Sequence, residues 1–125
     1  MISNILLYIG SIIIIVWGVG HIIPAKSIIN DFGPISKNNR RIITMEWAAE
    51  GLTLCFIGLL VLFITILGGQ QNPVSIIVHR ISAVMLLVMA GWTLFTGART
   101  SIIWIKICPA VKTAVAILFI LGSVL

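Results

Sequence analysis

Apolar residues along this chain occur in four long blocks, separated by short stretches that hold most of the charges. Three blocks without Asp, Glu, Lys or Arg cover residues 5–23, 52–69 and 81–98, and a shorter block covers 113–125. A helix rises about 1.5 Å per residue, so roughly 20 apolar residues cross a hydrocarbon core about 30 Å thick. The pattern therefore predicts an all-α fold: an integral membrane four-helix bundle in one domain, residues 1–125. The expected helices cover about 4–23, 37–68, 74–98 and 101–125.

Composition leads to the same class of protein. Hydrophobic residues make up 60% of the chain and charged residues 9%, whereas soluble domains have roughly 25% charged residues. A soluble core of this length could not cover so much apolar surface, so the lipid bilayer is the expected partner. The net charge of +5 lies beside the apolar blocks, which favours anionic lipid headgroups over nucleic acid as its counter-charge. We expect no nucleic-acid partner and a multi-pass location in the cell (inner) membrane.

The distribution of basic residues predicts an orientation. The connection at 24–43 holds four Lys or Arg residues against one Asp, and the third connection contains Arg99. Basic connections stay in the cytoplasm, so both termini and the second connection are expected on the outer side. His79 and Arg80, next to the second connection, are then interpreted as an interfacial basic pair. Residues 1–4 lack the basic charge that begins a secretory signal, so the first block is expected to be a retained helix.

Local signals refine the helix boundaries. Residues 31–34, Asp-Phe-Gly-Pro, are typical of a turn, and Ser36 is placed to cap the N-terminus of the second long helix. Pro109 has no backbone N–H to donate and its ring clashes with the preceding turn, so we expect it to kink the fourth helix. The segment 102–105 is then expected to lie at the membrane interface, with Trp104 at headgroup level.

Counting 1.5 Å per residue from the outer ends of the helices places three ionisable groups at one level. His21, Glu50 and Lys112 lie about 24, 27 and 20 Å down, in the inner third of a core about 30 Å thick. His79 lies nearer the outer boundary, about 20 Å from His21 in depth, which argues against a haem held by both histidines. The Glu-x-x-His motifs of a di-iron site do not occur. We therefore expect no metal and no cofactor.

The densest polar and aromatic segment surrounds Glu46, Trp47 and Glu50. The two glutamates are four residues apart and project from one helix face. A lone charge at depth costs a few kcal/mol, so Glu50 is expected to pair with a basic group or to face a wet cavity. Its available partners are basic residues near the fourth helix: Lys112, Lys106 and Arg99. A structural pair and a ligand or proton site both remain open, while Glu46 is expected to be solvated.

His21 follows two glycines that favour close helix packing, Gly18 and Gly20. A histidine hydrogen-bonded locally at headgroup level and a histidine that exchanges protons with Glu50 both fit this position. Cys55 and Cys108 are single and far apart, so they are interpreted as small buried hydrophobes. The tryptophans fall in the cytoplasmic half, where they form an aromatic belt or line a lipophilic pocket: Trp17, Trp47, Trp92 and Trp104.

The layout of the chain resembles the DoxX-like group of small four-helix membrane proteins. The resemblance rests on four spans in about 125 residues, on residues 18–21 (Gly-Val-Gly-His) late in the first helix, and on Glu46, Glu50 and Gly51 in the second. It implies a four-helix membrane fold, and some members of such families are linked to quinone-dependent oxidation of sulfur compounds. A more distant likeness is to the sterol-isomerase type. Small multidrug exporters are disfavoured because they carry a carboxylate in the first helix, which has none here.

Three functions fit these residues. The first and preferred is a non-enzymatic subunit or binding module for a lipophilic molecule, with a polar cluster in the cytoplasmic half of the bundle. The second is a membrane enzyme or redox subunit acting on a quinone, sterol-like or isoprenoid substrate, and the third is a proton-coupled transporter. A second copy or another membrane subunit is a further candidate partner. The candidate ligand- or proton-binding residues are Glu50, Glu46, His21, Trp47 and Lys112.

Overall fold

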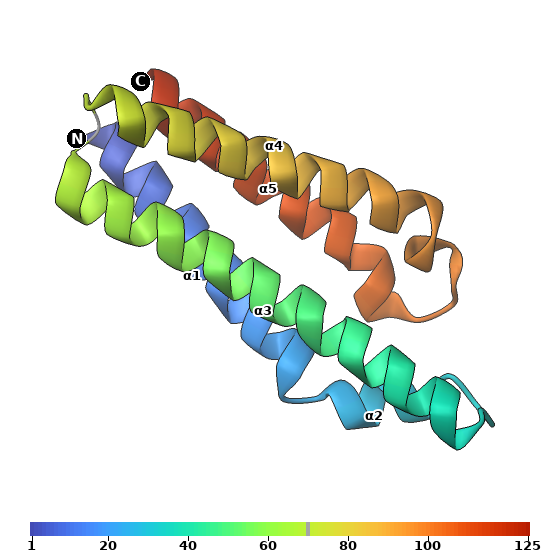
Figure 1. Cartoon of the computed structure of the whole chain (residues 1–125). Helices are drawn as coiled ribbons and strands as arrows, with labels where there is room; N and C mark the ends of the chain where they lie inside the picture. The colour runs from blue at the N-terminus through green and yellow to red at the C-terminus, as the bar shows by residue number, and fades with distance from the viewer. Residues whose placement is uncertain (70) are drawn as a thin grey trace.

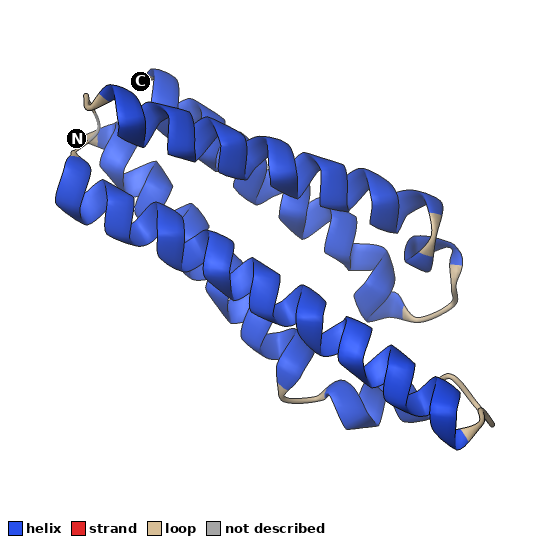
Figure 2. Ribbon diagram, in the orientation of Figure 1, coloured by secondary structure: helices blue, strands red, loops and turns tan. Residues whose placement is uncertain are grey.

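The computed structural model describes residues 1–69 and 71–125, and these form helices joined by short connections (Figures 1 and 2). The elements in chain order are α1 (Ile2–Ile22), α2 (Ala25–Asn30), α3 (Lys37–Gly68), α4 (Pro73–Phe95), the short 3₁₀ helix η1 (Gly97–Arg99) and α5 (Ile103–Val124). Four of them, α1, α3, α4 with η1, and α5, are long and apolar enough to cross a membrane. The predicted all-α architecture with four membrane-length helices is therefore confirmed.

Side-chain caps fix where the long helices begin. The Ser36 hydroxyl accepts a hydrogen bond from the Asn39 backbone N–H at 3.1 Å, as predicted, and α3 begins at the next residue. Asn72 does the same for α4, accepting from the Val74 N–H at 2.9 Å. Between these caps, α3 ends at Gly69, whose φ of 67° is readily adopted only by glycine.

Two local features add to the predicted helices. Residues 25–30, before the predicted turn, form α2, which contacts α3 and contains buried Ile28 and Ile29. α5 runs as one helix from Ile103 through Pro109, so the segment before this proline belongs to the same helix as the segment after it. Cys108 and Pro109 are both buried in the bundle, so packing on both sides of the proline holds the helix together.

The four long helices do not contact one another equally. α1 packs mainly on α3, and also on α5; α4 packs mainly on α5, and α3 makes few contacts with α4. The buried core combines ten residues from all four helices: Leu7, Ile14, Leu54, Ile57, Val61, Ala83, Leu86, Val115, Ala116 and Phe119. Figure 1 shows α3 and α4 close together near the chain termini and diverging toward the opposite end, where α2 and η1 lie. Both termini lie at the same end of the bundle.

Glycines allow α1 and α3 to cross in close contact. A Cβ atom added to Gly18 would lie 2.7 Å from the Gly51 carbonyl oxygen and 2.7 Å from the Cys55 sulfur. A Cβ added to Gly51 would lie 2.8 Å from the Gly18 carbonyl. Gly20 has open space instead, so only Gly18 of the two predicted glycines serves this contact. The crossing brings the end of α1 against the middle of α3.

Candidate functional site

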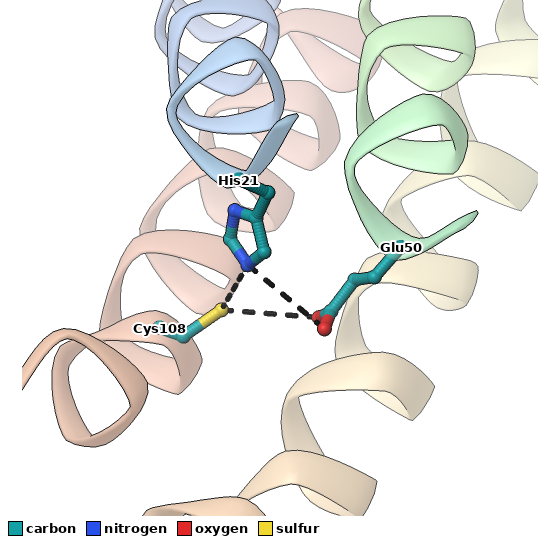
Figure 3. Close-up of side chains that lie close together, drawn as sticks. All are labelled: His21, Glu50 and Cys108. Atoms are coloured by element: carbon teal, nitrogen blue, oxygen red, sulfur yellow. Dashed lines mark hydrogen bonds and ion pairs between the residues drawn. The ribbon is translucent and has the colours of Figure 1, made fainter. Parts of the chain in front are cut away.

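Three side chains from three helices converge just beyond this crossing (Figure 3). His21 comes from α1, Glu50 from α3 and Cys108 from α5. The His21 Nε2 lies 3.9 Å from the Glu50 Oε2 and 3.8 Å from the Cys108 Sγ, which is 3.9 Å from the Glu50 Oε1. The sequence predicts that His21 and Glu50 lie at the same depth. In the structure their polar groups also approach each other directly.

The His21 ring is held in one orientation. Its Nδ1 lies 2.9 Å from the Trp17 carbonyl oxygen, which can only accept, so Nδ1 carries the proton that is donated. In the neutral ring the Nε2 lone pair then faces Glu50 and Cys108. The ring stacks on Trp47, with 4.8 Å between centroids, and meets the edge of Trp17. His21 is thus hydrogen-bonded locally through Nδ1 while its Nε2 lies near Glu50 and Cys108.

Lys112 completes the cluster from the side of α5. It is fully buried, and its ammonium group donates to the Glu50 carboxylate and, at 3.1 Å, to the Thr93 hydroxyl of α4. A buried ammonium is tolerated only when a counter-charge and further hydrogen bonds replace water. The pairing of Glu50 with Lys112, one of the partners expected from the sequence, is present.

Cys108 was not among the residues selected from the sequence. It is buried, as expected for a small hydrophobe, but its sulfur accepts a hydrogen bond from the Trp17 indole N–H at 3.3 Å and lies beside His21 and Glu50. The signal that could have found it is its spacing from Lys112, because residues four apart share a helix face. A cysteine one turn before a buried lysine faces the same partners.

A large groove opens along the line where α3 and α4 diverge. It has a volume of about 930 Å³, and its walls come mainly from α3 and α4, with Ile105 and Lys112 contributed by α5. Most of its lining is apolar or aromatic, including Val88, Trp92 and Phe95, while Glu50, Lys112 and Thr93 supply polar groups. The Glu50 side chain is 27% exposed and Lys112 is not exposed at all, so the carboxylate meets the groove while the ammonium lies behind it.

A second, smaller pocket lies on the other side of the cluster. It measures about 360 Å³ and is lined by residues of α1, α2, α3 and α5, with His21 and Asp31 as its ionisable groups. Three of the four tryptophans, Trp17, Trp47 and Trp104, line it, and Trp92 is in the groove instead. Trp47 borders both cavities. Each tryptophan thus borders at least one of the two cavities, and Trp92 and Trp104 are also exposed on the outside of the bundle.

Two other ionisable groups lie apart from this cluster. Glu46 is exposed, one turn from Glu50 at the edge of the groove, and does not join the His21–Glu50–Lys112 contacts. His79, interpreted from the sequence as interfacial, is fully buried, and its Nε2 lies 3.1 Å from the Thr65 hydroxyl. The His79 side chain is therefore packed inside the bundle, where Thr65 of α3 supplies its polar partner. Arg80 is exposed and donates to the Ser123 hydroxyl.

No protein-family model matches the chain, and no curated protein or solved structure is significantly similar to it. The fold defines its class as a small protein with four membrane-length helices.

Proposed function

We propose that this protein binds a lipophilic molecule in the groove between α3 and α4, with the polar group of that molecule against Glu50. The observation that carries the proposal is the Glu50–Lys112 ion pair beside a mostly apolar groove. Binding sites for small molecules are concave and mostly apolar, with a few polar groups that fix orientation, and their volumes run from about 300 to 1,000 Å³. The groove fits this description in shape, composition and volume.

The exposed carboxylate indicates which polar group the ligand carries. Lys112 occupies one oxygen of Glu50 from behind, and the partly exposed carboxylate can accept a further hydrogen bond from the groove side. A hydroxyl or other hydrogen-bond donor on an apolar body therefore suits the site. Sterol-like alcohols, isoprenoid alcohols and quinols have this chemistry. The role requires no catalytic step, in keeping with a binding module or subunit.

The proposed setting is the cell (inner) membrane, with the basic connections in the cytoplasm and both termini outside. The end of the bundle away from the termini carries Lys26, Arg40 and Arg41, which line a shallow pocket between α2 and α3, and Arg99 of η1. Anionic lipids of the cytoplasmic leaflet attract such groups. Membership of the DoxX-like group is proposed as well, supported by the meeting of Gly18, His21, Glu50 and Gly51 at one helix crossing.

Glu50→Gln, with Glu46→Gln as its matched control, tests the proposal. Both variants remove one carboxylate from the side of α3 that borders the groove, but only the Glu50 carboxylate is held by Lys112. Each protein is purified in detergent and its organic extract is analysed by mass spectrometry. We expect a lipophilic molecule to leave with wild type and Glu46→Gln and to fall at least tenfold in Glu50→Gln. Equal recovery from all three proteins would overturn the proposal.

The approach of His21 to Glu50 supports a second candidate. A carboxylate 3.9 Å from an imidazole nitrogen can exchange a proton with it through a small shift or one water. Such exchange would serve either an enzyme acting on the bound molecule or a proton-coupled transporter. Proton release when a lipophilic cation is added would favour transport, and chemical change of the extracted molecule on incubation with the protein would favour an enzyme.

A further inference from the structure

We propose that His21, Glu50 and Cys108 bind a divalent transition-metal ion, of which zinc suits the donor set best. The inference does not depend on the groove ligand, because it rests on the three atoms that face one another inside the bundle. One ligand atom from each residue can be chosen so that all three lie within 4.8 Å of one another. The ligands come from α1, α3 and α5. Because they lie far apart in the sequence, they form no short metal-binding motif.

The triangle of ligand atoms has nearly the right size. Two of its edges measure 3.8–3.9 Å and the third is at most 4.8 Å. The centre of such a triangle lies about 2.3–2.5 Å from its corners, compared with about 2.3 Å for a zinc–sulfur bond and 2.0–2.2 Å for bonds to nitrogen and oxygen. If the three side chains move a few tenths of an ångström toward the centre of the triangle, these distances match the bond lengths.

The surroundings of His21 are those of a metal ligand. Histidines that bind metals donate their other ring N–H to a carbonyl or carboxylate, which fixes the ring and the free nitrogen. His21 does this through Nδ1 and the Trp17 carbonyl, leaving Nε2 directed at the triangle. A neutral ring in this state places a lone pair 3.9 Å from a carboxylate oxygen. A bound cation turns that unfavourable approach into a favourable one.

The sulfur and the carboxylate are also supported from outside the triangle. The Trp17 indole N–H donates to the Cys108 sulfur at 3.3 Å, and Lys112 donates to one oxygen of Glu50, leaving the other oxygen on the side of His21. Hydrogen bonds of this kind orient metal ligands. Nitrogen, sulfur and oxygen donors together favour zinc over magnesium or calcium, which prefer oxygen alone.

The charges of the donor set suit a divalent cation. Binding would release the thiol proton of Cys108 to solvent, and zinc, one thiolate and one carboxylate would then sum to zero. Water would fill the fourth position. The pocket of about 360 Å³, lined by His21 and the acidic Asp31, provides the route by which a cation reaches the triangle.

Cobalt(II) is the probe for this site because a thiolate–cobalt bond produces a charge-transfer absorption that zinc lacks. The full chain, freed of any affinity tag and stripped with a chelator, is titrated with Co²⁺ and then with Zn²⁺. We expect one Co²⁺ per chain, a thiolate charge-transfer band, tetrahedral visible bands and displacement by Zn²⁺. A spectrum without a charge-transfer band would overturn the proposal.

Cys108→Ser and Cys55→Ser form the matched pair. Cys55 is the other free cysteine, and its sulfur lies near the Ile15 carbonyl rather than in the triangle. Cys108→Ser should lose the charge-transfer band and Cys55→Ser should keep it; the reverse, or no difference, would contradict the assignment. Trp17→Phe, which keeps an aromatic ring but removes the N–H to the sulfur, should weaken Zn²⁺ binding about tenfold.

Protection of Cys108 is a measurement that does not depend on a folded variant. Zn²⁺ should slow alkylation of Cys108 in the wild-type protein at least tenfold and leave the rate at Cys55 unchanged, as read by peptide mass spectrometry. Equal rates with and without Zn²⁺ would refute the site. The proposals of a metal site and of a groove ligand can be refuted independently of each other. Cys108→Ser should lose the metal but should still release the lipophilic molecule on extraction.

Discussion

Gly18 of α1 and Gly51 of α3 face each other so closely that neither position has room for a side chain. This contact positions the polar cluster, because His21 lies one turn after Gly18 and Glu50 lies directly before Gly51. Small residues let transmembrane helices approach closely enough for their backbones to touch. The approach of His21 to Glu50 therefore depends on two glycines that carry no chemistry themselves.

Gly51→Ala should destabilise the protein by about 1–3 kcal/mol, the usual effect of overpacking a close contact. The added methyl group would meet the Gly18 carbonyl oxygen at 2.8 Å and the His21 Cβ at 2.9 Å. Gly20→Ala is the control, since its Cβ would have open space. Unfolding free energies from steric trapping in lipid bicelles provide the comparison, and equal stabilities of the two variants would contradict the close crossing.

Lys112→Met should cost about 3–5 kcal/mol of stability, because it leaves the Glu50 carboxylate without its counter-charge. Adding Glu50→Gln to this variant should recover part of the loss, since the amide needs no counter-charge. Lys106→Met, on the same helix but exposed, should change stability by less than about 1 kcal/mol. A double-mutant cycle in the same unfolding assay measures the coupling, and strictly additive effects would exclude a direct pair.

Thr65→Val should destabilise the bundle by about 1–3 kcal/mol without affecting ligand or metal binding. The Thr65 hydroxyl is the partner of the buried His79 ring, and its loss leaves the Nε2 without that hydrogen bond. Thr44→Val is the matched control, because the Thr44 hydroxyl bonds the Arg40 carbonyl of its own helix and lies outside the groove. Loss of the extracted lipophilic molecule in Thr65→Val would show that His79 is part of the site after all.

The proposed orientation predicts which connections face the cytoplasm. With both native cysteines replaced by serine, Gln71→Cys in the second connection should react with a membrane-impermeant maleimide on intact cells. Ser101→Cys in the third connection should react only after the membrane is permeabilised. Both positions are exposed, so accessibility to solvent does not bias the comparison. The opposite labelling pattern would reverse the orientation.

Much of the fold follows from local features of the sequence. The apolar blocks predict four long helices, and Ser36 marks the start of α3 because capping depends only on neighbouring backbone groups. The short helix α2 does not follow in this way. Its buried residues Ile28 and Ile29 pack against α3, and a helix of six residues is stable only through such tertiary contact.

The site could be predicted only as far as depth along the helices determines it. Counting residues brought His21, Glu50 and Lys112 to one level, and all three do meet. Depth does not determine how a helix is rotated about its axis. The inclusion of Cys108, the exclusion of Glu46 and the burial of His79 all depend on that rotation, which the packing of neighbouring helices sets. The groove likewise results from the sparse contact between α3 and α4.

The central claim, that the groove between α3 and α4 holds a lipophilic molecule, is tested most directly by filling the groove. Gly91 lines it and Gly20 lines the smaller pocket, and a side chain at either position begins in open space. Native mass spectrometry of Gly91→Leu and Gly20→Leu beside wild type measures the bound molecule on the intact chain. We expect the adduct on wild type and Gly20→Leu and its loss from Gly91→Leu. An adduct that persists on Gly91→Leu, or that disappears only from Gly20→Leu, would contradict binding in the groove.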